Sequence, residues 1–126
     1  SSEELEASVG QLEYSMNEAI FHMPDDLVES EADFIFDTVR KKKLPTMFNE
    51  DFWAIRGAMA AYGPNYYEMG RQAARLVEAI LKGRKAETLP IQRASKFDLT
   101  LNYRTANFIG VNLSKEMLKK ADRVIR

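Results

Sequence analysis

The chain has 126 residues, 45% of them hydrophobic, so it is long enough to bury one core of ordinary size. Its 18 basic and 19 acidic side chains nearly cancel, and the longest run of like charge is residues 40–43, which leaves no broad positive surface for nucleic acid. The absence of cysteine excludes disulfides, thiolate metal sites and thiol nucleophiles. No apolar run approaches the roughly 20 residues that cross a bilayer.

The first elements alternate between helical and extended periods, which predicts an α/β fold with a parallel sheet and helices layered on it. Ser1 and Glu4 have the spacing of a capping box, so we expect a helix there and a sequence that begins inside a longer parent, without its signal sequence. A buried strand is predicted over residues 19–23. Asp26 with Glu29 is interpreted as the cap of a second helix. Its predicted inward side chains are Val28, Ala32, Ile35, Phe36 and Val39.

A second strand is predicted over residues 46–48, which completes a β-α-β unit with parallel strands. Residues 49–56 are predicted to form a loop, and residues 58–62 a third short strand that Gly63 ends. Asn65 caps the helix that follows. The predicted inner stripe of that helix is Gly70, Ala73, Ala74, Val77, Ile80 and Leu81.

The last third is predicted to begin with a polar crossing connection over residues 84–95. Period-two alternation over residues 97–102 predicts a strand with one wet face at a sheet edge. A helical turn over 105–108 and a final helix capped by Ser114 complete the chain. The final helix is predicted to carry Leu118, Ala121 and Ile125 inward.

Three loops follow predicted strands, at residues 24–26, 49–53 and 62–67. Ligands of open α/β sheets bind at the carboxyl ends of parallel strands, so these loops are the candidate site. They carry a mixture of carboxylates, amides and aromatic rings that suits a small organic ligand with an ammonium group and an apolar body. The candidate ligand contacts are Asp25, Asp26, Asn49, Glu50, Trp53, Tyr62 and Tyr66.

Several candidates have a structural alternative. Asp26 is interpreted first as a helix cap, whereas Asp25 is more open to a ligand role. Trp53 and Tyr66 either stack on a solute or pack against the sheet, and Tyr67 is interpreted as a core residue. The single histidine, at position 22, is interpreted as structural, because one imidazole without a second histidine or a cysteine is a poor metal site.

The sequence lacks a complete catalytic site. Glu50 and Asp51 are neighbours in a segment predicted to be extended, where side chains point to opposite faces and make a poor acid/base pair. No glycine-rich phosphate loop, nucleophile elbow or zinc motif is present, so no cofactor is predicted. An enzyme that uses Asp25 or Glu50 as its base is the minor alternative.

Three segments carry a resemblance to a known family. Residues 44–50 (LPTMFNE), 56–63 (RGAMAAYG) and 66–72 (YYEMGRQ) resemble the ABC-transporter substrate-binding family that includes tryptophan and other amino-acid receptors. The resemblance implies a periplasmic-binding-protein class I fold, in which two lobes close about a hinge on a small solute. It also implies a periplasmic or extracytoplasmic location and docking of the loaded receptor on a membrane permease.

The same resemblance implies roles for particular segments. The whole chain, 1–126, would be one α/β fragment of a two-lobed protein, with second-lobe β-α-β units in 1–63 and a hinge-side helix, crossing strand and terminal helices in 64–126. Asp25 and Asp26 would be polar ligand contacts, Asn49 and Glu50 would line the cleft, and 62–67 would be a hinge-side loop. The alternative function for the same fold is that of a ligand-sensing domain in a signalling receptor. Because the fragment would expose apolar surface, self-association into a homo-oligomer is expected.

Overall fold

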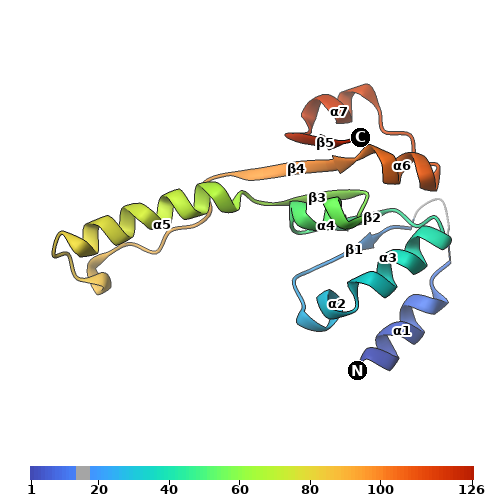
Figure 1. Ribbon diagram of the computed structural model, residues 1–126, viewed down its shortest axis with the longest axis horizontal. Coiled ribbons are helices and arrows are strands. Elements are labelled where there is room, and N and C mark those ends of the chain that lie inside the picture. Colours follow the sequence, from blue (N-terminus) through green and yellow to red (C-terminus); the bar gives the residue numbers. More distant parts are fainter. Residues whose placement is uncertain (14–17) are drawn as a thin grey trace. The chain divides into compact units, whose positions relative to one another are not determined.

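The computed structural model describes residues 1–13 and 18–126, which form two compact units. The larger unit contains residues 1–63 and 98–126, and the smaller contains residues 64–97. Figure 1 labels the elements along the chain. The helices are α1 (Ser2–Gln11), α2 (Asp26–Ser30), α3 (Ala32–Lys41), α4 (Asp51–Arg56), α5 (Tyr66–Leu81), α6 (Tyr103–Ile109) and α7 (Lys115–Lys120), with a 3-10 turn η1 (Ala86–Thr88). None of the helices in the described part of the chain combines the length and apolarity of a membrane span.

The described residues also form one five-stranded sheet in the order β1-β2-β3-β4-β5. Its strands are β1 (Ile20–Phe21), β2 (Thr46–Phe48), β3 (Ala60–Pro64), β4 (Phe97–Asn102) and β5 (Arg123–Ile125). The pairs β1/β2, β2/β3 and β4/β5 are parallel. The predicted α/β class and the parallel first β-α-β unit are therefore confirmed.

The sheet of the larger unit separates two hydrophobic clusters. Phe48 belongs to the cluster under α1, α3 and α4, whereas Met47 packs against the cluster under α6 and α7. Neighbouring side chains of a strand point to opposite faces, so these clusters lie on the two faces of β2. Ala60, which pairs with Met47, belongs to the second cluster together with Leu101. Both faces of the central strands are thus covered, as expected for buried parallel strands.

Helix caps follow the predicted pattern at three helix starts. Ser1 and Glu4 form both halves of a capping box on α1. Asn65 accepts from the Glu68 N–H on α5 at 2.9 Å, and Ser114 caps α7. Each contact joins residues three positions apart, which is the spacing that the sequence reveals directly.

Several predicted elements need correction. The single helix predicted after Asp26 is divided at Glu31 into α2 and α3, and the strand predicted over 19–23 runs only over Ile20–Phe21. Residues 51–56 form helix α4 rather than a loop, and the third strand runs over Ala60–Pro64, past Gly63. The strand Phe97–Asn102 has the predicted bounds but lies between β3 and β5 rather than at a sheet edge. Ile125 belongs to β5 and not to the last helix. Pairing with distant strands decides the cases of β3, β4 and β5, and the periodicity of a segment does not show which strands will pair with it.

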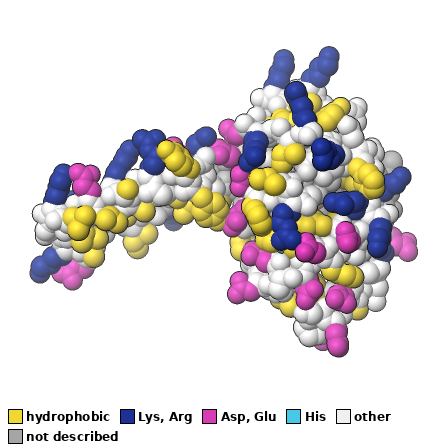
Figure 2. Space-filling model, viewed as in Figure 1, with side chains coloured by type: hydrophobic (Ala, Val, Ile, Leu, Met, Phe, Trp, Pro, Cys, Tyr) yellow, Lys and Arg dark blue, Asp and Glu magenta, His cyan; other side chains and the backbone are white. Residues whose placement is uncertain are grey.

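The smaller unit is α5 with the segment that returns along it. The Gln72 side chain donates to the Arg93 carbonyl at 3.1 Å and accepts from the N–H and hydroxyl of Ser95. No residue of α5 is buried, so the predicted inner stripe is wrong. Val77 and Leu81 are 53% and 82% exposed, and Figure 2 shows hydrophobic side chains along this unit.

Candidate functional site

The carboxyl ends of the first three strands meet in the larger unit. The His22 Nδ1 atom, just after β1, lies 2.8 Å from the Asn49 Oδ1 atom, just after β2. At the end of β3, an added Cβ on Gly63 would lie 1.6 Å from the Asn49 carbonyl oxygen. Only glycine permits this approach of two backbones. Asn49 is therefore the point at which the three strand ends come together.

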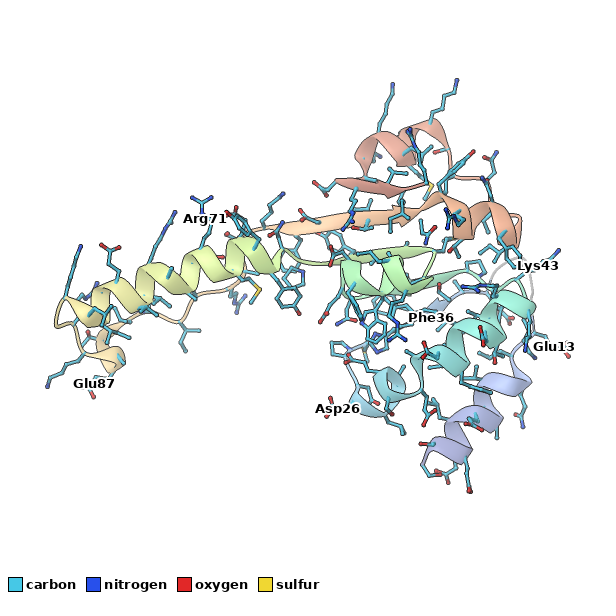
Figure 3. All side chains as sticks on the ribbon, viewed as in Figure 1. Glu13, Asp26, Phe36, Lys43, Arg71 and Glu87 are labelled. Carbon is cyan, nitrogen blue, oxygen red and sulfur yellow. The ribbon has the colours of Figure 1, made fainter. Side chains whose placement is uncertain are left out.

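Asp25 and Asp26 lie at the start of the short helix α2. The Asp25 side chain accepts from the Val28 N–H at 3.0 Å, so Asp25 is the N-cap. The assignment of Asp26 as the cap is wrong by one residue, because Asp26 is the first residue inside the helix. Both side chains are exposed, and Figure 3 labels Asp26 at the outer end of α2. Their role as ligand contacts stays a prediction.

Asn49 and Glu50 connect β2 to helix α4. Asn49 is half-buried, and Glu50 occupies the N-cap position of α4 with extended backbone. Asp51, in the first turn, forms an ion pair with Arg123 at 3.4 Å. This ion pair links α4 to β5, so the Asp51 carboxylate contributes to contacts within the unit. Ligand contacts of Asn49 and Glu50 stay predictions.

Trp53 lies in the first hydrophobic cluster with only 6% of its surface exposed. Its ring centroid is 6.1 Å from that of Phe36, labelled in Figure 3, and 5.8 Å from that of Phe48. The Arg56 guanidinium lies over the indole at 5.7 Å. These contacts favour the packing interpretation of Trp53 over stacking on a solute.

The candidate tyrosines belong to different units. Tyr62 lies in β3 of the larger unit and is 52% exposed. Tyr66 is the first residue of α5 in the smaller unit and is 54% exposed. Ligand contacts of both stay predictions. Tyr67 is 76% exposed, so its interpretation as a core residue is wrong.

His22 is buried, with 3% of its surface exposed, and its ring stacks on Phe48 at 4.6 Å. This packing confirms its structural interpretation. Among the described residues no group of three or more histidine, aspartate and glutamate side chains could hold a metal. The sequence does not reveal the hydrogen bond between His22 and Asn49, because the two residues lie 27 positions apart. The available signal was a polar residue inside an apolar strand.

A cavity of about 330 Å³ opens beside β1. Its volume falls in the range of small-molecule sites, roughly 300–1,000 Å³. The lining is apolar except for His22 and Asp25. The remaining lining residues are Leu5, Val9, Leu12, Ile20, Phe21, Met23, Val28, Ile35 and Phe48. Asp25 is thus the candidate contact that borders this cavity.

A family model described as ABC transporter substrate binding protein matches residues 1–125. The chain belongs to this family. The match confirms the resemblance carried by the three sequence segments. The family description is one of substrate binding rather than catalysis. Comparison with the curated proteins found no match.

Solved structures of similar fold include three of bacterial origin. A conserved domain protein from Vibrio cholerae is 26% identical with a TM-score of 0.81, and the match covers 98% of this chain and 40% of that one. An ABC domain from Streptococcus pneumonia in complex with L-Trp is 18% identical with the same TM-score and coverage. A ligand-free, open substrate binding protein with adhesive properties from Clostridium difficile is 20% identical, with a TM-score of 0.73 and coverage of 99% and 41%. This chain of the substrate-binding family therefore spans about 40% of the length of the structures that it matches.

Proposed function

We propose that this chain is part of a two-lobed receptor that binds a small solute, such as an amino acid, for an ABC importer. The observation that supports this most is the meeting of three strand ends at Asn49, in a chain whose family match covers residues 1–125. Carboxyl ends of parallel strands are where open α/β sheets bind ligands. The binding step is hinge closure about the solute, without covalent chemistry.

The residues after these strands suit a zwitterionic ligand. Asp25, Asp26 and Glu50 supply carboxylates that pair with an ammonium group, and Tyr62, in β3 of the same unit, supplies a ring for an apolar body. The similar structure in complex with L-Trp makes L-tryptophan the first ligand to test. As part of an importer the receptor would work outside the cytoplasm, and we propose that its loaded form docks there on a membrane permease.

Calorimetric titration of the longest natural polypeptide that contains this chain tests the proposal. We expect saturable binding of at least one of the twenty amino acids, after a thermal-shift screen in which the ligand raises the melting temperature. Asn49→Ala should weaken that binding at least tenfold, because Asn49 lies where the strand ends meet. Asn107→Ala, an exposed asparagine on α6, is the matched control and should leave affinity unchanged.

Two outcomes would contradict the proposal. One is the absence of any shift or heat with all twenty amino acids. The other is equal affinity of the wild type and the Asn49→Ala variant for the ligand, which would show that the solute does not bind at this edge of the sheet. Turnover of a bound amino acid that disappears with Asp25→Asn would instead favour an enzyme.

A further inference from the structure

The contact between His22 and Asn49 fixes the direction of an amide. Asn49 Oδ1 is an acceptor only, so the tautomer that makes this 2.8 Å contact a hydrogen bond carries its proton on Nδ1 and leaves the buried Nε2, which has no partner among the described residues, unprotonated. The imidazole has little freedom to turn away, because it is 3% exposed and stacks on Phe48 at 4.6 Å. The ring of Trp53 closes a second side in an edge-on contact at 6.3 Å. In this tautomer His22 holds Asn49 in one orientation.

This orientation determines what Asn49 offers to a ligand. With Oδ1 accepting from His22, the Nδ2 amino group is the remaining polar group of the side chain, and it can only donate. The backbone of Asn49 is fixed as well, because its carbonyl oxygen packs against Gly63. The side chain is half-buried at the carboxyl end of β2. A preorganised donor at this position suits an oxygen acceptor.

We infer that His22 is a positioning residue that makes Asn49 a fixed hydrogen-bond donor, and that this donor selects solutes bearing a carboxylate. The inference rests on the proposed function, since it assumes that the solute reaches Asn49. It adds a division of roles within that site. The carboxylates at Asp25, Asp26 and Glu50 suit the cationic end of the solute, and Asn49 suits the anionic end.

Two substitutions of the same imidazole separate positioning from packing. His22→Phe keeps an aromatic ring against Phe48 but removes the donor to Asn49. His22→Asn keeps a donor, because the asparagine Nδ2 atom occupies nearly the same place as the histidine Nδ1 atom. A residue that served only the core would tolerate the ring better than the smaller amide. If His22 is a positioning residue, the His22→Asn variant should bind the ligand more tightly than the His22→Phe variant.

The experiment measures the affinity of L-tryptophan and of tryptamine, which lacks the carboxylate, by calorimetry on the longest natural polypeptide that contains this chain. We expect His22→Phe to weaken L-tryptophan binding about tenfold or more and to leave tryptamine within about threefold. His22→Asn should keep L-tryptophan binding within about threefold of the wild type. Equal losses for both ligands, or no loss in His22→Phe, would overturn the inference and leave the proposed function standing.

If neither L-tryptophan nor tryptamine binds the wild type, that result counts against these ligands and so against the proposed function. The role of His22 in orienting Asn49 is then tested by a measurement that needs no ligand. The imidazole nitrogens of the ligand-free protein are observed by ¹⁵N NMR. A protonated Nδ1 with a slowly exchanging proton, lost in Asn49→Ala, is the expected result. An unprotonated Nδ1, or a spectrum unchanged by Asn49→Ala, would refute the role of His22 in orienting Asn49.

Discussion

Substitution of Gly63 by alanine should separate the ends of β2 and β3. The added Cβ would lie 1.6 Å from the Asn49 carbonyl oxygen and 2.7 Å from its carbonyl carbon. The first distance is roughly half of the 3.0 Å below which real Cβ atoms essentially never approach another atom. Both opposing atoms belong to the backbone, so no side chain can turn aside to relieve the clash. Relief requires the two strand ends to move apart.

We expect the free energy of unfolding of the larger unit to fall by at least about 3 kcal/mol in Gly63→Ala, at the upper end of the cost of overpacking. The two strands pair through Met47 with Ala60 and Phe48 with Ala61, close to the clash, so a shift would also weaken that pairing. The chain's single tryptophan is buried in the same unit. Its fluorescence during urea denaturation therefore reports the unfolding of this unit.

Gly70→Ala is the matched control. Gly70 lies within α5, and an added Cβ there would meet no atom within 4 Å. Alanine is the better helix former, so circular dichroism at 222 nm should give a gain of up to about 1 kcal/mol in the stability of the helix. A Gly63→Ala variant with the urea midpoint of the wild type would refute the close approach at Asn49.

Three further predictions concern other parts of the fold. Asn102→Ala should destabilise the larger unit by about 2–4 kcal/mol in urea denaturation, because this buried side chain donates to a carbonyl of α4 at 2.8 Å and caps α6 at 2.9 Å. A cost below about 1 kcal/mol would contradict that double role. Asp25→Ala should cost about 1 kcal/mol and Asp26→Ala clearly less, because only the first side chain caps α2; the reverse order would restore Asp26 as the cap. Leu81→Lys should reduce self-association of the isolated chain in sedimentation equilibrium, since Leu81 is 82% exposed on an uncovered helix, whereas Phe108→Lys on α6, 61% exposed, is the control. Equal effects of the two substitutions, or a monomer at high concentration without either, would show that α5 is not the surface that associates.

The accuracy of the sequence predictions depended on the distance between the interacting residues. The capping box of Ser1 and Glu4 and the cap of Asn65 on α5 were predictable because each involves residues three positions apart. The cap of α2 was misplaced by one residue because Asp25 and Asp26 are both good capping residues. The ligand site at the carboxyl ends of the strands stays a prediction, which rests on the alternation of strands and helices and on the general place of ligands in open α/β sheets.

The sequence by itself determined the α/β class, the parallel pairing of the first strands and the family, because periodicity and short motifs are local properties of the chain. Tertiary structure alone decided that residues 51–56 form a helix, that β4 is an inner strand and that α5 lies exposed. It also decided the contact of His22 with Asn49, across 27 positions of sequence. The physical reason is that burial and side-chain hydrogen bonding depend on which distant segments pack together, and one sequence does not state those neighbours.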